Sequence, residues 1–299
     1  MYVRFTDAPT REGQRMPTTP MLARRRLGNE LRTLRDLRRL TVEEVGAQLG
    51  WHKSKVSRIE NAQSGITRRD LYKLMELYEV DSDGREKCEA LVADGRERSW
   101  WAIAPYADVL NNDYQEQIGL EAEAAAICEY QPLLIPGLLQ TADYSRAVIG
   151  SGPFVQDEED IETLVDVRQR RQRVLLTEDD PVEYAGVITM AALMYETGGR
   201  RTLRAQLAHL LDVARRSNVT VQVIPYDAPA PTTAGLTLLH FRETEDPTVA
   251  FVDTVTVSHQ RDNAREIRRY VRFFDYLRNN ALDSTKTQAI IKKRLEDLK

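Results

Sequence analysis

Residues 27–63 read LGNELRTLRDLRRLTVEEVGAQLGWHKSKVSRIENAQ, and they carry the clearest fold signal of the chain. Thr41 precedes an apolar-periodic run and Glu44 follows three residues later, so hydroxyl and carboxylate can satisfy the first helical N–H groups reciprocally. This capping box predicts a short helix from Val42 to about Leu49. Gly50 then supplies the residue that most often ends a helix, because glycine adopts left-handed backbone angles without strain.

A second short helix is predicted from Lys53 to about Glu60, with Val56 and Ile59 facing inward. Gly46, on the first of the two helices, lacks a side chain where the second helix must cross closely. Two short helices joined by a tight turn predict a helix-turn-helix, the unit that places its second helix in the major groove of DNA.

From Leu27 to about Val80 the chain resembles the Xre-type (Cro/C1, lambda repressor-like) helix-turn-helix family. The resemblance implies a structural ion pair between Arg35 and Glu60. The residues implied to read base edges are Lys53, Ser54, Ser57 and Arg58. The residues implied to contact DNA phosphates are His52, Lys55, Arg68 and Arg69. Arginine to guanine is the commonest specific contact, so we expect Arg58 to contribute most to sequence choice.

Two positions depart from that family. Val42 stands where many members carry a DNA-contacting glutamine, and Ala62 stands where they carry glycine. The resemblance therefore implies no particular operator, and Ala62 predicts a modified turn after the second helix.

Charge is divided unevenly along the chain. Residues 1–80 hold 16 Lys and Arg against 10 Asp and Glu, whereas the remaining residues hold 26 against 36. A basic first part on an acidic body favours phosphate binding at one end, although a solvated helical face would also be basic. The low overall pI of 5.8 does not argue against DNA binding.

Length and composition favour a multidomain protein. A chain of 299 residues is long enough for two or three cores, and 42% hydrophobic with 29% charged residues is ordinary for folded domains. No apolar run reaches the length of a bilayer span, and the N-terminus is unlike a signal peptide. We therefore expect a cytoplasmic, nucleoid-associated protein without a membrane partner. Cys88 and Cys128 lack CxxC spacing and nearby histidines, so we expect lone thiols.

The fold class that we expect is an all-α helix-turn-helix bundle, then a helical linker, then an α/β domain. The predicted boundaries are a flexible arm at 1–20, the bundle at 21–80, the linker at 81–130 and the α/β domain at 131–299. In the arm, Arg4, Arg11 and Arg15 could touch a minor groove, or the segment is a disordered tail. Further helices are predicted at 20–39, 67–78, 82–99 and, from the composition of LEAEAAAICEY, at 120–130.

The later part of the chain alternates strand and helix signals. Strands are predicted where β-branched residues gather, at 182–189, 219–226, 235–241 and 248–257. Helices are predicted at 160–176, 202–217, 263–280 and 284–298. This succession predicts a mixed sheet covered by helices. The proline-rich loop at 226–235 is either a ligand loop at a strand end or a plain connection.

Four strings in this part resemble the actinobacterial DUF5753 domain, also described as Scr1-like antitoxin-type regulators. They are LIPGLLQTADYSRAVI (134–149), RQRRQRVLL (168–176), AQLAHLLDVARRSNVTVQVIPYD (205–227) and RYVRFFDYLRNNALDSTKT (269–287). The resemblance covers Trp100 to Lys299. It implies a domain that dimerises and senses a signal, and a small DUF397-type protein as a partner.

Sequence signals for catalysis are few. His52, His209, His240 and His259 show no metal-ligand spacing, and GxSxG, P-loop and GxGxxG motifs are missing. Asp253 and His259 could meet on neighbouring elements. The GGR run at 198–200 offers backbone N–H groups for an anion, although a loop between helices explains it as well. We therefore expect a protein that is not an enzyme, with no cofactor and no metal site.

Together these observations predict a homodimeric transcriptional regulator that binds double-stranded DNA in a sequence-specific way. Its C-terminal domain is expected to be controlled by a DUF397-type protein or by a small-molecule effector, and the sequence does not choose between them. The alternative is an antitoxin-like protein that neutralises a small partner and binds DNA only for autoregulation.

Overall fold

The structure is a computed structural model that describes residues 20–94, 99–152, 157–177, 180–229, 234–242, 246–254 and 258–299. The chain divides into two compact units between Trp100 and Trp101. Arg4, Arg11 and Arg15 of the predicted arm lie outside the described residues, as does part of the proline-rich loop, at 230–233.

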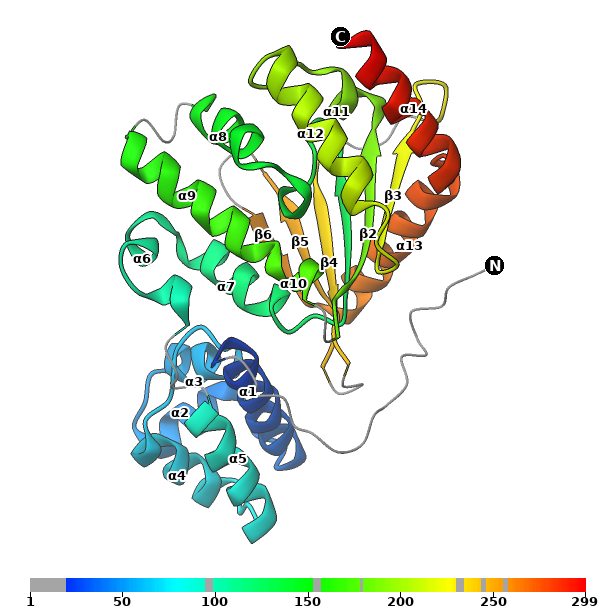
Figure 1. Ribbon diagram of the computed structural model, residues 1–299. Helices are drawn as coiled ribbons and strands as arrows, with labels where there is room; N and C mark the ends of the chain where they lie inside the picture. The colour runs from blue at the N-terminus through cyan, green and yellow to red at the C-terminus, as the bar shows by residue number, and fades with distance from the viewer. Residues whose placement is uncertain are drawn as a thin grey trace. The chain divides into compact units, whose positions relative to one another are not determined.

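The first unit is a bundle of helices (Figure 1). They are α1 (Pro20–Leu37), α2 (Val42–Leu49), α3 (Lys53–Glu60), α4 (Arg68–Leu77) and α5 (Ser82–Asp94). Their shared core contains Leu31, Val45, Val56, Leu74 and Met75. The expected bundle is confirmed. Helix α1 ends two residues earlier than predicted, because Arg39 adopts a left-handed backbone conformation with φ 56°.

Helix α5 belongs to this bundle and not to a linker. Its Cys88 and Val92 are buried in the same core as Leu31 of α1 and Met75 of α4. The apolar face of α5 is therefore needed to close the bundle, which corrects the predicted domain end near Val80. The predicted continuation beyond Asp94 reaches residues 95–98, which lie outside the described part of the chain.

The second unit is built on one mixed sheet. Its strands are β1 (Ala126–Gln131), β2 (Glu183–Thr189), β3 (Val219–Ile224), β4 (Leu236–His240), β5 (Val249–Asp253) and β6 (Ser258–Arg261). They lie in the order β3-β2-β1-β4-β5-β6. Strands β1, β2 and β3 run parallel, and each of β4, β5 and β6 is antiparallel to its preceding neighbour in this order. The predicted mixed sheet is confirmed.

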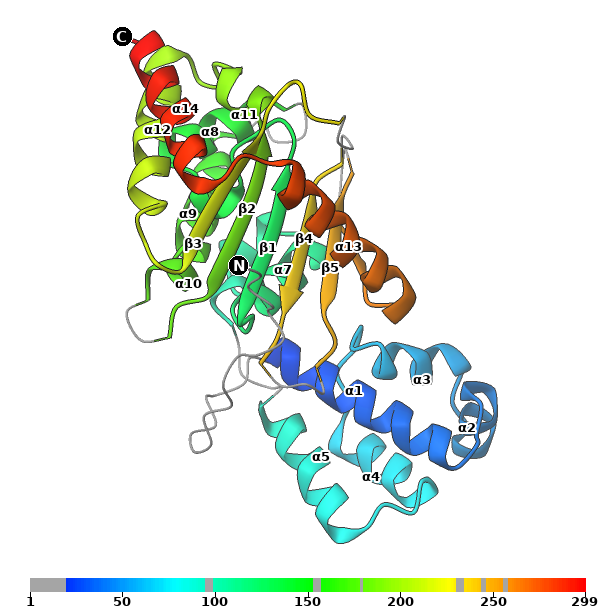
Figure 2. The same cartoon turned by 90° about the vertical axis from the view of Figure 1, so that its right-hand side faces the viewer.

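Helices cover both faces of this sheet (Figures 1 and 2). They are α6 (Tyr106–Val109), α7 (Asn112–Glu121), α8 (Ala142–Gly150), α9 (Glu158–Arg171), α10 (Arg173–Leu176), α11 (Met190–Met194), α12 (Arg200–Val213), α13 (Ala264–Asn280) and α14 (Ser284–Asp297), with 3₁₀ turns at Trp100–Ala102 and Gly137–Leu139. Helix α13 lies on one face, where its Ile267, Phe274 and Leu277 pack against the strands. Helices α9 and α12 lie on the other face.

The helix predicted at 120–130 is wrong. Helix α7 ends at Glu121, and Ala126–Gln131 forms strand β1, which pairs with β2 on one side and with β4 on the other. Residues 126–130 are all buried. Alanine and glutamate favour a helix locally, but two ladders of backbone hydrogen bonds and burial on both faces outweigh that weak preference. The predicted linker thus contributes α5 to the first unit and α6, α7 and β1 to the second.

Candidate DNA-binding surface

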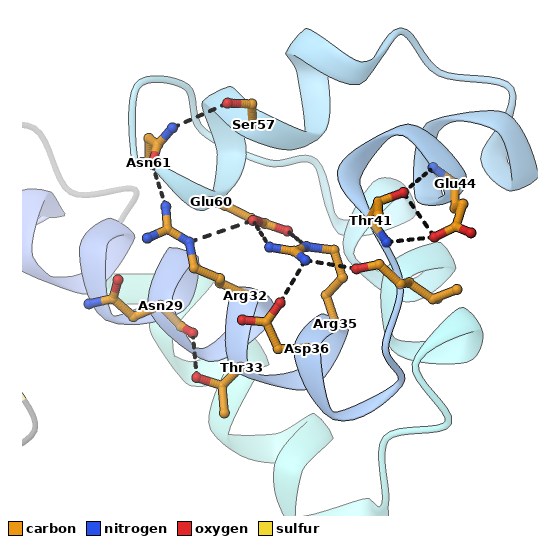
Figure 3. Close-up of polar contacts among 11 residues, drawn as sticks. Asn29, Arg32, Thr33, Arg35, Asp36, Thr41, Glu44, Ser57, Glu60 and Asn61 are labelled. Atoms are coloured by element: carbon orange, nitrogen blue, oxygen red, sulfur yellow. Dashed lines mark hydrogen bonds and ion pairs between the residues drawn. The ribbon is translucent and has the colours of Figure 1, made fainter.

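Helix α2 is fixed at both ends by the residues that predicted it. Thr41 N donates to Glu44 Oε2 at 2.7 Å and Glu44 N donates to Thr41 Oγ1 at 3.2 Å, which is the expected capping box (Figure 3). The Glu44 carboxylate accepts from Thr41 N and also from Thr41 Oγ1, the latter at 2.8 Å, and these two hydrogen bonds lower the pKa of Glu44. At the other end Gly50 is left-handed with φ 68°, and Trp51 N donates to Gly46 O at 2.8 Å.

Two glycines allow the close approaches on which the motif depends. A Cβ added to Gly46 would lie 2.8 Å from the backbone oxygen of Trp51, in the turn that leads into α3. A Cβ added to Gly28 of α1 would lie 2.5 Å from the backbone oxygen of Glu60, at the end of α3. The first contact confirms the predicted close crossing. The second was not predicted, because nothing local in α1 marks the point where α3 ends against it.

The predicted ion pair holds the end of α3 against α1 (Figure 3). Arg35 Nε donates to Glu60 Oε1 at 2.7 Å and Arg35 Nη2 donates to Glu60 Oε2 at 3.0 Å, a two-pronged pairing. The side chains are 12% and 4% exposed. Arg35 Nη1 also donates to Leu40 O at 2.8 Å and lies 2.7 Å from Asp36. The hydrogen bond to Glu60 raises the pKa of Arg35 although burial opposes this.

A second arginine, which was not predicted, joins this pair. Arg32 lies one turn before Arg35 on α1, with its Nε 3.6 Å from Glu60 Oε2 and its Nη2 hydrogen-bonded to Asn61 Oδ1 (Figure 3). Asn61 Nδ2 in turn donates to Ser57 Oγ at 3.2 Å. The signal that could have found Arg32 is its three-residue spacing from Arg35, which places both on one face of α1.

Helix α3 presents the predicted base-reading residues unequally. Lys53, Ser54 and Arg58 are exposed, whereas Ser57 is half-buried and accepts the hydrogen bond from Asn61. Arg58 Nε donates to its own helix, at Ser54 O and 3.3 Å. Lys53 Nζ lies 3.0 Å from Glu43 Oε1 of α2, and this hydrogen bond lowers the pKa of Glu43. Arg58 is thus the exposed cation of α3 whose side chain contacts no acidic group among the described residues.

The predicted phosphate contacts divide in the same way. His52 caps α3, since its Nδ1 accepts from Ser54 N at 3.3 Å, and its side chain is exposed. Arg68 and Arg69 are exposed in the first turn of α4. Lys55 is half-buried: its Nζ lies 2.8 Å from Asp70 Oδ2 and 4.0 Å from the centre of the Trp51 ring.

The Lys55–Asp70 pair ties α3 to α4. Partial burial raises the pKa of Asp70, but hydrogen bonds from Lys55 and Thr67 outweigh it and lower the pKa. A phosphate at Lys55 would share its ammonium group with Asp70, which takes one of the three N–H donors. The predicted role of Lys55 therefore competes with a structural one.

The turn after α3 is a regular Schellman motif. Gln63 N donates to Arg58 O at 2.8 Å and Ala62 N donates to Ile59 O at 3.1 Å. Ala62 has φ 57°, in the left-handed region that favours glycine. We expected a modified turn at this alanine, and the structure instead shows the backbone that glycine would adopt.

The residues weighed for catalysis are not brought together. Asp253 lies opposite Ser258 and His259 lies opposite Val252, so alternation along the strands points Asp253 and His259 to opposite faces of the sheet. Asp253 Oδ2 accepts from Gln131 Nε2 at 2.9 Å, and His240 Nδ1 lies 3.0 Å from Thr248 Oγ1.

Two other features of the sequence have a clear place in the structure. Cys88 and Cys128 are free, buried thiols in different units. Gly198 and Gly199 have φ of 71° and 87° and lead into α12. Across the described residues, acidic, histidine and cysteine side chains do not gather into a group of three that could hold a metal ion. Nor does any helix described there have the length and apolar character to cross a membrane.

Comparison with models of protein families finds two matches. A model described as "Domain of unknown function (DUF5753)" matches residues 114–293. A model described as "Helix-turn-helix domain" matches residues 26–88. No curated protein and no solved structure matches the chain.

Proposed function

The chain belongs to the DUF5753 family and carries a helix-turn-helix domain at residues 26–88, and from this premise we propose that it is a sequence-specific transcriptional regulator. The helix-turn-helix domain supports DNA binding. The finer proposals are that α3 reads bases, that two copies bind paired half-sites, and that the second unit controls DNA binding.

The observation that carries the proposal is the two-faced character of α3. Val56, Ile59 and Glu60 are buried against the bundle, whereas Ser54 and Arg58 are exposed on the opposite side and Lys53 is exposed in the first turn. The buried face is fixed by the Arg35–Glu60 pair. A rigid helix with exposed donors of this kind suits the major groove, where arginine can bind O6 and N7 of guanine together.

We assign the phosphate contacts to the ends of the neighbouring helices. His52 at the start of α3 and Arg68 and Arg69 at the start of α4 are exposed. Helix N-termini favour anions, because the backbone N–H groups there point outward and the helix dipole is positive. Contacts at these ends would position α3 without selecting a sequence.

A homodimer is proposed for an energetic reason. A single helix-turn-helix contacts few base pairs, and pairing two copies on half-sites about one helical turn apart raises both affinity and specificity. We place the dimerisation surface in the second unit, which spans about two-thirds of the chain.

Control through the second unit requires that a partner or effector binds the DNA-competent and DNA-incompetent states with different affinities. A small DUF397-type protein or a small molecule would meet this requirement. We propose a binding role and not a catalytic one for this unit, and the opposite orientations of Asp253 and His259 support that choice.

A second candidate is an antitoxin-like protein, in which neutralising a small partner is the main activity and DNA binding is autoregulatory. The size of the second unit relative to the DNA-binding unit favours it. Rescue of growth by a chain with Arg58→Ala, in a cell that expresses the toxic partner, would support this candidate over the first.

The experiment that tests the main proposal is immunoprecipitation of the tagged full chain, followed by sequencing of the bound DNA. It is repeated with Arg58→Ala and with a control, Arg265→Ala, which removes an exposed arginine from α13 of the second unit. We expect a few near-palindromic sites for the parent and the control. The Arg58→Ala chain should lose about 1–3 kcal/mol of binding free energy on the strongest site and relax base choice at one position.

Equal losses on operator and random DNA would remove Arg58 from the base-reading set. Absence of discrete sites for the parent chain would contradict sequence-specific regulation and favour the second candidate.

A further inference from the structure

An open cleft of about 860 Å³ lies between α12 and α14 of the second unit. The two helices lie side by side in Figure 1, and both line the cleft. Its lining combines two kinds of side chain. The basic ones include Arg200, Arg201 and Arg204 from α12 and Lys292 from α14, and the apolar ones include Ala205, Ala208 and Leu295.

The cations at this cleft are largely free to bind a ligand. Arg201, Arg204 and Lys292 are exposed, and their side chains have no hydrogen-bond or ion-pair partner among the described residues. Arg200 is engaged, since its Nη2 donates to Asp297 O at 2.8 Å and its Nη1 lies 3.4 Å from Glu196. Glu296 adds one acidic group to the lining. The cleft is therefore basic.

The positive charge of the cleft contrasts with the net charge of the second unit. Residues 101–299 hold 22 Lys and Arg against 30 Asp and Glu, so the unit as a whole is acidic. Arg200 and Arg201 also lie in the first turn of α12, where the helix dipole disfavours cations. Glu196 and Asp297 O compensate Arg200 there, whereas Arg201 has no such partner among the described residues, and an anionic ligand would compensate for its position.

We propose that this cleft binds an acidic, partly apolar segment of a partner protein. The shape favours a peptide over a small molecule, because small-molecule sites enclose most of their ligand and this cleft is open along two helices. The apolar lining favours it over an inorganic anion, because Ala205, Ala208 and Leu295 offer contacts that only an apolar group can use. A lining of basic and apolar side chains matches an amphipathic segment whose polar face carries carboxylates.

The regulatory consequence of this inference rests on the proposed function, namely that the second unit controls DNA binding. Binding of the acidic segment to the cleft does not depend on it. Binding of the acidic segment itself can be measured without DNA, and DNA binding can be measured without the segment. Failure of one therefore remains distinguishable from failure of the other.

The test is fluorescence anisotropy with the full chain and a labelled twelve-residue peptide that repeats Glu-Glu-Leu-Leu three times. A peptide with lysine in place of glutamate is the matched ligand control. The variant is Arg201→Glu, Arg204→Glu and Lys292→Glu together. The matched protein control is Arg265→Glu, Arg268→Glu and Arg269→Glu on α13, where three exposed arginines also lack a side-chain partner among the described residues.

We expect saturable binding of the acidic peptide alone, weakened about tenfold or more in the cleft variant and little changed in the α13 control, which has the same net charge. The single change Arg204→Ala should weaken binding in the same direction, and it keeps the test informative if the triple variant does not fold. The cleft triple variant and the α13 triple control should both bind DNA as the parent does, which would show that the first unit is intact in each.

Three results would overturn the proposal. They are equal losses in the two triple variants, no saturable binding up to about 1 mM peptide, and displacement of the peptide by inorganic phosphate at an equal concentration. The last result would mean that the cleft holds any small anion.

Discussion

A buried ion pair between Arg35 and Glu60 joins α1 to the end of α3 in the first unit. The Arg35–Glu60 pair is largely withdrawn from water, so its attraction is strong. Without its partner, each buried ion would keep only a more exposed counter-ion, Asp36 for Arg35 and Arg32 for Glu60. The pair therefore specifies where α3 ends against α1 more than it adds net stability. Arg32 and Asn61 extend the same arrangement to the edge of the candidate DNA-binding surface.

Replacing Glu60 should therefore be costly. We expect Glu60→Gln to lower the free energy of unfolding of the first unit by roughly 3 kcal/mol, because Arg35 keeps its charge without a buried counter-ion. Urea denaturation followed by circular dichroism measures this. The control is Glu79→Gln, since Glu79 pairs with Arg38 at 2.6 Å but is 74% exposed. A surface pair of this kind contributes at most about 1 kcal/mol. Similar losses in the two variants would contradict the structural role of Glu60.

Among the secondary-structure elements, the approach of α1 to α3 depends on the absence of a side chain at Gly28. We expect Gly28→Ala to destabilise the first unit by about 1–3 kcal/mol, because the new methyl group would meet the backbone of Glu60 and one helix would have to move. Thermal melting of the full chain checks this. Gly65→Ala is the control, because its added Cβ would meet nothing within 4 Å. A melting point as high for Gly28→Ala as for the control would show that the helices have room.

The central strands of the second unit carry a buried carboxyl group. Glu129 on β1 accepts a hydrogen bond from the Tyr184 hydroxyl of β2 at 2.8 Å. Burial, opposed by this hydrogen bond, raises the pKa of Glu129 to about 7. The folded chain therefore holds a proton that the unfolded chain releases near pH 4.3. It follows that the contribution of Glu129 is fully present below that pH and is lost as the pH rises through about 7.

We expect Glu129→Gln to remove this pH dependence. The variant should match the parent near pH 4 and exceed its stability at pH 8 by up to about 3 kcal/mol, because an amide has no proton to lose and still accepts from Tyr184. Denaturation of the second unit at both pH values measures the difference. Glu183→Gln, an exposed change on β2, is the control. A variant less stable than the parent at pH 8 would mean that the ionised carboxylate is favoured in the fold.

For the whole chain, the important property is the sign of the net charge of each unit. Residues 11–100 hold 19 Lys and Arg against 15 Asp and Glu, whereas residues 101–299 hold 22 against 30. We expect Arg68→Ala and Arg69→Ala each to weaken binding to all DNA sequences alike. Each should reduce the slope of log affinity against log salt by about 1. The measurement is a salt series on operator and random duplexes.

The control for the salt series is Arg268→Ala on α13, which should leave the slope unchanged. A reduced slope for this variant would place DNA contacts on the second unit as well.

Much of the first unit can be predicted from the sequence because helix caps, helix ends and inward-facing positions depend on residues that are close together in the chain. Thr41 and Glu44 cap a helix three residues apart, Gly50 ends it, and Val56 and Ile59 mark the inward face of the next one. All of these interactions join residues within a few positions of one another. The strands β2 to β5 can be predicted for a similar reason, since β-branched residues in short alternating runs favour an extended backbone.

Other features depend on partners far away in the chain. The composition of residues 120–130 favours a helix, yet Ala126–Gln131 is a strand because it pairs with β2 on one side and with β4 on the other. Helix α5 belongs to the first unit because Cys88 and Val92 are buried in its core. Position 28 requires glycine because the backbone of Glu60, at the end of α3, approaches it closely. The cleft between α12 and α14 joins side chains about 90 positions apart. Capping and periodicity are short-range and can be read along the chain, whereas strand pairing, core membership and surface charge clusters arise only when distant segments pack.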